Sequence, residues 1–193
     1  LNFNMYKLYY MPMCAASRAA KMILHEKGIK FHSINEPIWK RRIDFLKINP
    51  EGELPVVIDN EDNNIIGYFS LAYFLEESED KKKLIGDNPL SRLEVRRICK
   101  WFDYKFCKEV YQNIVEERVF KSLKGLGNPS SEFLKAGRAN LKNHENYFEW
   151  LLNNRTFLAG EFFSIADIIY ATYLSTLDYL GEIKWERINL TKK

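Results

Sequence analysis

The sequence of 193 residues predicts a small α/β domain followed by an all-helical domain. Short β-prone runs alternate with helical patterns only in the first 80 residues, whereas apolar residues after residue 90 follow helical spacing. Between these regions a charged run at 76–83 is followed by Gly86 and Pro89, a composition typical of a solvated linker. We therefore expect a first domain at 1–78, a linker at 79–90 and a second domain at 91–193.

The first domain is predicted to follow the element order β-α-β-α-β-β-α. Its first strand ends before Pro12, and its first helix stops at Gly28, a residue that commonly ends helices. Apolar residues at 39, 43 and 46 indicate a second helix, which stops before Asn49-Pro50. The strands are expected at 7–10, 29–34, 56–58 and from 65, and the helices at 14–27, 39–48 and 68–77.

The second domain is predicted to be helical. Apolar residues at 95, 98, 102, 106, 110 and 114 recur in steps of three and four, which indicates a long helix over 91–121. A second helix is expected at 130–153. Ser164 and Asp167 have the spacing of a capping box, and Phe163 and Ile168 have the spacing of a hydrophobic staple, so a third helix is expected to begin there.

The composition excludes several classes of protein. Lys+Arg number 29 and Asp+Glu 26, and this net charge of +3 argues against a strongly basic nucleic-acid-binding protein. An apolar fraction of 46% suits a packed core rather than a disordered chain. No apolar run reaches 18 residues, and Lys7, Arg18 and Lys21 interrupt the early apolar stretches, so neither membrane insertion nor a signal peptide is expected.

The cysteines and histidines indicate neither a disulfide framework nor a metal site. Cys99 and Cys107 would lie about 12 Å apart on a helix, too far for a disulfide. We therefore expect reduced cysteines and a cytoplasmic protein. The histidines are scattered and lack metal-ligand spacing with any cysteine, so no metal is expected; they are His25, His32 and His144.

Two motifs resemble the glutathione transferase superfamily. Residues 49–57 read N-P-E-G-E-L-P-V-V, similar to the family run N-P-x-G-x-V-P-V-L, and residues 157–167 resemble the family element F-L-x-G…S-x-A-D. The resemblance implies a thioredoxin-like first domain, a cis peptide bond before Pro55, a structural role for Asp167 and a homodimer. Superfamily members extend beyond the segment matching 184–186, so we expect a chain clipped at its C-terminus, with Met5 near the natural start.

Other stretches look like one alphaproteobacterial branch of this superfamily, whose members bind the bacterial tubulin homologue FtsZ and act in cell division. They are residues 39–42, 94–106, 109–110, 117–119 and 177–181. This resemblance implies a non-catalytic protein whose partner is FtsZ or another acidic protein, with no nucleic acid.

The alternative is a glutathione-dependent transferase or thiol reductase. Such an enzyme must stabilise a thiolate, and on this scaffold the candidate residues follow the first strand: Tyr10, Cys14 and Ser17. Cys14 at a helix start is a candidate low-pKa thiol, although a cysteine among small apolar residues is more often buried packing. The resemblance assigns glutathione binding to Leu54 and Pro55, and glutathione would be a substrate rather than a cofactor.

One departure from the family argues against ordinary glutathione binding. The acid-serine pair that starts the last helix of the family's first domain aligns with Gly67-Tyr68 here. The serine hydroxyl that would hold a ligand carboxylate is therefore missing, and Ser70 comes too late in the helix to replace it.

A partner-binding surface is the remaining functional signal. Trp39 is followed by Lys40, Arg41 and Arg42 at the predicted start of the second helix, a composition typical of protein-contact hot spots. Trp39 pinning its helix to the core is an equally open interpretation. Further cations at the start of the long helix oppose the helix dipole, which favours an acidic partner; they include Arg96 and Arg97.

Charge also differs between the two halves of the chain. Residues 1–80 hold 9 Lys+Arg and 12 Asp+Glu, whereas residues 81–193 hold 20 and 14. The resulting charges of −3 and +6 would favour a homodimer that packs the first domain of one subunit on the second domain of the other.

Overall fold

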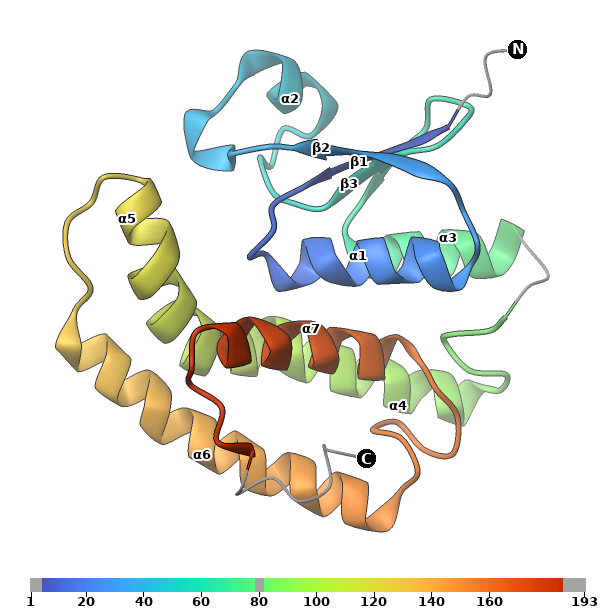
Figure 1. The fold of residues 1–193 in the computed structure, drawn as a ribbon. Helices are drawn as coiled ribbons and strands as arrows, with labels where there is room; N and C mark the ends of the chain where they lie inside the picture. The colour runs from blue at the N-terminus through green and yellow to red at the C-terminus, as the bar shows by residue number, and fades with distance from the viewer. Residues whose placement is uncertain (1–4, 79–81, 186–193) are drawn as a thin grey trace. The chain divides into compact units, whose positions relative to one another are not determined.

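The computed structural model describes residues 5–78 and 82–185. The chain divides into two compact units, Leu1–Ile85 and Gly86–Lys193, and the division falls inside the predicted linker (Figure 1). Leu84 and Ile85 are buried, so this segment is not solvated along its whole length as we expected. The limits at 78 and 91 stay predictions.

The first unit is built on a four-stranded mixed sheet of order β2-β1-β3-β4. β1 runs parallel to β2 and antiparallel to β3, and Leu8 pairs with Ser33 on one side and Val57 on the other. The strands are β1 (Tyr6–Tyr10), β2 (Phe31–Asn35), β3 (Val56–Ile58) and β4 (Asn64–Ile66). This is the thioredoxin-like arrangement that the resemblance implies.

Three helices complete the first unit: α1 (Ala15–Glu26), α2 (Ile43–Ile48) and α3 (Tyr68–Ser78). α1 and α3 pack against each other on one side of the sheet, and α2 lies on the other side (Figure 1). A buried ion pair joins the end of α1 to α3, with Lys27 Nζ 3.1 Å from Glu76 Oε1. The strands and helices of this unit follow one another in the order that the sequence predicts.

The predicted helix at 39–48 is wrong in its first residues. A single turn of 3₁₀-helix, η1 (Ile38–Lys40), is separated from α2 by Arg41, whose φ of 45° lies in the left-handed region. A residue in that conformation does not continue a right-handed helix, so the helix begins only after Arg42. Three apolar positions alone could not reveal this break.

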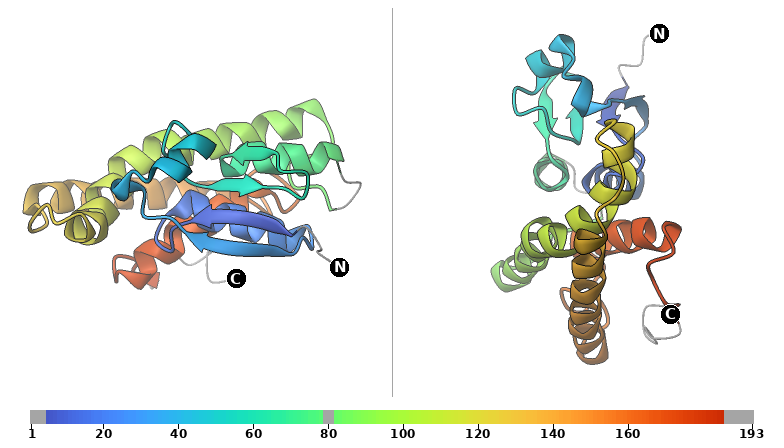
Figure 2. Two further views of the ribbon diagram at one scale, coloured as in Figure 1. Left: turned by 90° about the horizontal axis from the view of Figure 1, so that it is seen from above. Right: turned by 90° about the vertical axis from the view of Figure 1, so that its left-hand side faces the viewer.

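The second unit is helical, as predicted. One continuous helical run, made of α4, η2 and α5, carries α6 and α7 along its length (Figure 2). Aromatic rings fill its core, where Phe102 stacks on Phe148 and Tyr173 at 5.2 and 5.7 Å between ring centroids. The bounds are α4 (Pro89–Lys100), η2 (Trp101–Phe120), α5 (Lys121–Leu123), α6 (Ser131–Asn154) and α7 (Ile165–Tyr179).

The middle of the long helix is not the ordinary α-helix that its apolar spacing led us to expect. η2 is a π-helix, in which an N–H bonds the carbonyl five residues earlier, as Lys121 N does with Glu116 O. The buried residues Phe102, Phe106 and Val110 recur in steps of four, more than the 3.6 residues of an α-helical turn. Phe102 and Phe106 lie on one face, because both contact Phe148 of α6 and Tyr173 of α7.

Several local predictions are confirmed. Ser164 and Asp167 form the capping box of α7, with Asp167 Oδ2 accepting a bond from Ser164 N at 2.9 Å. The Leu54–Pro55 peptide bond is cis. Cys14, Cys99 and Cys107 form no disulfide. The Phe163–Ile168 staple stays a prediction.

No helix in the described ranges is both long and apolar enough to cross a bilayer. Within those same ranges, no group of three His, Cys, Asp or Glu side chains is placed to hold a metal ion.

Candidate functional site

The candidate catalytic residues Tyr10, Cys14 and Ser17, here named the thiol corner, lie where β1 leads into α1. Cys14 is the N-cap of α1, and its sulfur accepts a hydrogen bond from Ser17 N at 3.4 Å. Ser17 is fully buried, and its hydroxyl oxygen accepts a bond from Met11 N, also at 3.4 Å. These contacts cap the helix and shape the turn before it, which is a structural use of both side chains.

The surroundings of Cys14 do not favour a thiolate. Burial is the largest influence and raises the pKa of the Cys14 thiol, and the Glu53 carboxylate raises it further. Hydrogen bonds from Ser17 and from Ala16 N act in the opposite direction and are outweighed. The direction is opposite to the low-pKa thiol that the helix start led us to expect, because desolvation outweighs the helix N-terminus.

Tyr10 is held by its ring and its backbone. Lys21 Nζ lies 5.5 Å from the centre of the Tyr10 ring, and Tyr10 O accepts a bond from Glu36 N at 3.0 Å. The aromatic side chain is half-buried. These contacts agree with the packing role that an aromatic residue on a short strand usually has.

The predicted glutathione-binding residue Pro55 is hydrogen-bonded to Gly67, the first residue of the Gly67-Tyr68 pair that replaces the family's acid-serine pair. Pro55 is buried, and its carbonyl accepts a hydrogen bond from Gly67 N at 2.9 Å. The next residue, Tyr68, starts α3 and is only 4% exposed, while Ser70 is exposed. The position of the family's carboxylate-binding serine is thus occupied by a packed aromatic ring.

The residues Trp39, Lys40, Arg41 and Arg42, here named the cationic turn, lie before α2 rather than in it. The three cations are exposed and Trp39 is half-buried. Ile43, the first residue of α2, is 72% exposed, so an apolar side chain stands beside the charges. An exposed apolar group beside cations suits contact with an acidic protein surface.

The structure reveals a partner of this turn that the sequence analysis missed. Glu36 is fully buried, and its Oε2 lies 3.2 Å from Arg42 Nη2. Neither carboxylate oxygen accepts a hydrogen bond from the part of the chain that the structure describes. The ion pair is therefore the main compensation for a buried charge. The available signal was that Glu36 is the only acidic residue between Glu26 and Asp44.

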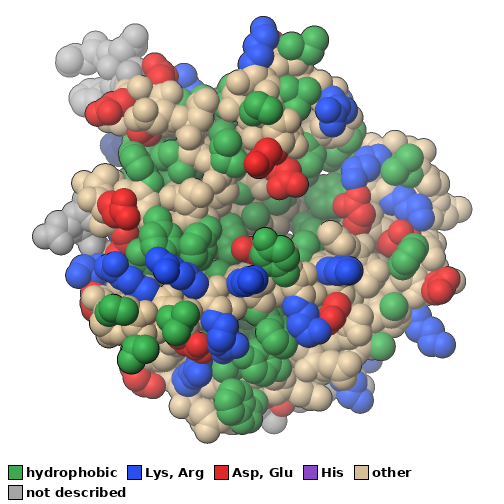
Figure 3. All heavy atoms as spheres, turned by 180° about the vertical axis from the view of Figure 1, so that it is seen from behind, with side chains coloured by type: hydrophobic (Ala, Val, Ile, Leu, Met, Phe, Trp, Pro, Cys, Tyr) green, Lys and Arg blue, Asp and Glu red, His purple; other side chains and the backbone are tan. Residues whose placement is uncertain are grey.

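The cations at the start of the long helix are partly neutralised within the second unit. Arg97 donates two hydrogen bonds of 2.7 Å to Glu94 and one of 2.8 Å to the Tyr147 hydroxyl. The bonds from Arg97, with others from Arg155, lower the pKa of Glu94 to about 2. Arg96 is exposed. Figure 3 shows a row of Lys and Arg side chains along this helix with hydrophobic side chains beside it.

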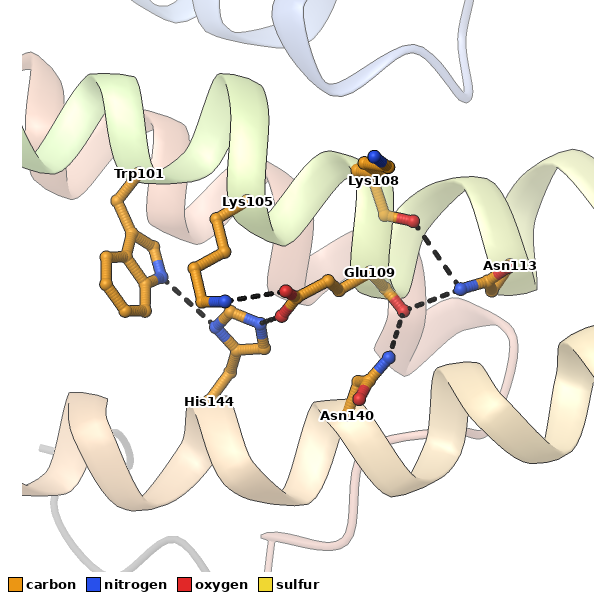
Figure 4. A network of polar contacts seen from close by, with 7 residues as sticks. All are labelled: Trp101, Lys105, Lys108, Glu109, Asn113, Asn140 and His144. Atoms are coloured by element: carbon orange, nitrogen blue, oxygen red, sulfur yellow. Dashed lines mark hydrogen bonds and ion pairs between the residues drawn. The ribbon is translucent and has the colours of Figure 1, made fainter.

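A second network, also missed in sequence, joins η2 to α6 (Figure 4). Trp101 Nε1 donates to His144 Nδ1 at 3.1 Å, so the proton of the neutral ring is on Nε2, which lies 2.9 Å from Glu109 Oε2. Lys105 Nζ lies 2.6 Å from the other oxygen of Glu109. Burial lowers the pKa of His144, and the bond from Lys105 lowers that of Glu109. This network fastens two helices together.

The comparisons with known proteins agree with the sequence motifs. Residues 8–82 match the family model of the glutathione S-transferase N-terminal domain. FtsZ-localized protein A of Caulobacter vibrioides is 34% identical over 96% of this chain and 82% of that protein. The structure of FzlA from C. crescentus is 33% identical with a TM-score of 0.93, over 97% of this chain and 84% of that one.

A structure described as a glutathione S-transferase, from Rhodospirillum rubrum, is equally similar. It is 37% identical with a TM-score of 0.94, over 97% of this chain and 85% of that one. Because the chain is similar both to an FtsZ-localized protein and to a glutathione S-transferase, overall similarity does not choose between these functions. The choice depends on the side chains of the thiol corner and the cationic turn.

Proposed function

Because the chain belongs to the glutathione S-transferase superfamily, we propose that its scaffold serves to bind FtsZ filaments in the cytoplasm and to regulate cell division rather than to catalyse transfer. FtsZ-localized protein A is similar along nearly the whole chain, which supports FtsZ as the partner. The observation that carries the non-catalytic part is Tyr68, a buried ring in place of the carboxylate-binding serine.

The cationic turn is the first proposed contact with the filament. Lys40 and Arg41 are exposed and carry the charge that would steer an acidic filament surface into contact. Trp39 and Ile43 supply the apolar area that such a contact buries. Arg42 contributes through its ion pair with Glu36, which holds the turn in shape.

The start of the long helix is the second proposed contact. Arg96 and Arg97 lie there beside the exposed side chains of Leu90 and Leu93, which are 77% and 62% exposed. Because Arg97 is bonded to Glu94 and Tyr147, we expect its own contribution to binding to be reduced.

Co-sedimentation with polymerised FtsZ tests the proposal. We expect the protein to pellet with FtsZ polymers at moderate salt and to remain in the supernatant when FtsZ is unpolymerised. Higher salt should weaken pelleting, because charge steers the encounter. A folded protein that never pellets with the polymers would contradict the proposal.

Glutathione-dependent catalysis is the second candidate, favoured by the similarity to the Rhodospirillum rubrum protein. It would use Cys14 or Tyr10 for the thiol and Leu54 with Pro55 for binding. A saturable rise in melting temperature with millimolar glutathione, together with turnover of a generic electrophile, would establish it. We expect neither, because the pKa of Cys14 is raised and Tyr68 fills the serine position.

We also propose a homodimer, on the basis of the superfamily resemblance alone. The charge argument for it is weaker than the sequence suggested. With the division after Ile85, the run Lys81-Lys82-Lys83 falls in the first unit, and the unit charges become 0 and +3. Sedimentation equilibrium at monomer mass would refute the dimer.

A further inference from the structure

A cavity of about 620 Å³ lies in the second unit, where the segment after α7 passes η2 and α6. Its size is within the usual range of small-molecule sites. Four cations line it, Arg118, Arg138, Lys142 and Lys184, and the lining contains two carboxylates, Glu145 and Glu182. The lining therefore carries a charge of +2.

Glu182 holds the two arginines in place. Its Oε1 accepts bonds from Arg118 Nη1 at 2.7 Å and from Arg138 Nη2 at 2.9 Å, and its Oε2 accepts a bond from Arg138 Nε at 2.8 Å. The carboxylate is only 6% exposed, and Arg138 lowers its pKa, so it stays ionised at neutral pH. Two guanidinium groups from different helices are thus fixed at one point.

These bonds leave much of the arginines' donor capacity unused. The Nε and Nη2 groups of Arg118 and the Nη1 group of Arg138 bond no acceptor within residues 5–78 and 82–185. Lys142 and Lys184 form no ion pair with any residue in those ranges. Fastening the chain to η2 and α6 needs only the bonds to Glu182 and Leu180. The remaining donors and the two exposed lysines are therefore available to a ligand in place of water.

We propose that this cavity binds a small multivalent organic anion, one that carries phosphate or carboxylate groups. Guanidinium groups with fixed geometry and lysines nearby are the side chains that recognise such anions. Leu141 and Leu180 line the same cavity and offer apolar contact to the carbon skeleton of the ligand. The site lies within the second unit and does not depend on FtsZ binding.

Isothermal titration calorimetry with pyrophosphate and with citrate, at constant ionic strength, tests whether this cavity binds an anion. We expect saturable binding of at least one probe; pyrophosphate alone indicates a phosphate ligand and citrate alone a carboxylate ligand. The Lys142→Gln/Lys184→Gln variant should bind at least tenfold more weakly with an unchanged melting temperature. Lys135→Gln, an exposed change on α6 outside the cavity lining, is the matched control and should bind as the wild type does.

Two results would overturn the proposal. One is the absence of saturable binding of both probes at millimolar concentration. The other is equal affinity of the wild type and the folded Lys142→Gln/Lys184→Gln variant, which would place any bound anion elsewhere.

Discussion

The two regions proposed to contact a partner hold their arginines in different ways. In the first unit, Arg42 lies 3.2 Å from Glu36, a fully buried carboxylate whose oxygens accept no hydrogen bond from the described residues. In the second, Arg97 makes two 2.7 Å bonds to Glu94, which is 24% exposed and is also bound by Arg155. One carboxylate depends on a single cation, and the other has two.

This difference indicates that cationic residues in similar sequence contexts contribute differently to stability. Removing one partner of a buried pair leaves an uncompensated charge, whereas an exposed pair contributes little to stability. We therefore expect Arg42 to contribute to stability and Arg97 to contribute little. Lys40 and Arg41 should affect partner binding but not stability.

The largest expected effect is at the pair that Arg42, which is 54% exposed, forms with the buried Glu36. Arg42→Ala should lower the free energy of unfolding by about 1–2 kcal/mol. The substitution leaves Glu36 buried without a cation, but the Arg42 side chain is exposed, so solvent already screens part of the pair. Urea denaturation measures the change, and Lys47→Ala on α2, whose partner Asp44 is 90% exposed, should cost almost nothing.

A second substitution separates charge from packing at this pair. Adding Glu36→Gln to Arg42→Ala should recover part of the lost stability, because the amide carries no charge. A cost below about 0.5 kcal/mol for Arg42→Ala alone would show that solvent already compensates Glu36.

The pair of His144 with a third carboxylate, Glu109, is expected to make stability depend on pH. Burial lowers the pKa of His144 below its ordinary value of 6.5, so the unfolded chain takes up its proton first as the pH falls. Stability should therefore fall as the pH drops from 6.5 through the folded-state pKa. Urea denaturation at pH 7.5 and 5.5 measures this.

The His144→Gln variant is the control for this pH dependence. It should lose about 1 kcal/mol at pH 7.5 through a weakened hydrogen-bond network and should show a smaller decrease between the two pH values. An equal decrease in wild type and variant would assign the pH dependence to other groups.

A smaller effect is expected at Arg97. Its side chain is 43% exposed, and Glu94 keeps its bond to Arg155 when Arg97 is lost. Arg97→Ala should therefore cost less than about 1 kcal/mol in urea denaturation. A cost equal to that of Arg42→Ala would remove the distinction between the two pairs.

The smallest effect on stability is expected at the exposed cations of the turn. Lys40→Glu/Arg41→Asn keeps a residue tolerant of left-handed backbone at 41 and should change the free energy of unfolding by less than about 0.5 kcal/mol. The same variant should bind FtsZ polymers at least tenfold more weakly, with Lys135→Glu on α6 as the exposed charge-reversal control. Undiminished binding would exclude the turn as a contact.

Much of the fold could be predicted because its signals are local. The capping box at Ser164 and Asp167 and the glycine that ends α1 act through neighbouring backbone groups, which sequence spacing reveals. The break at Arg41 could not be predicted, because the spacing of apolar residues does not reveal that the backbone of Arg41 is left-handed.

The candidate site was less predictable for the same reason. Cys14 has the sequence position of a reactive thiol, but desolvation depends on the residues packed around it. His144 and Glu109 lie 35 residues apart, and only the packing of α6 on η2 brings them together. By contrast, the replacement of the acid-serine pair by Gly67-Tyr68 was visible directly, because it lies inside an ungapped motif.

The most direct test of the central claim is a paired FtsZ co-sedimentation of the Cys14→Ser and the Lys40→Glu/Arg41→Asn variants. If the chain is a non-catalytic filament binder, Cys14→Ser pellets with FtsZ polymers as the wild type does, whereas the turn variant stays largely in the supernatant. Loss of pelleting in Cys14→Ser together with full pelleting of the turn variant would contradict the account.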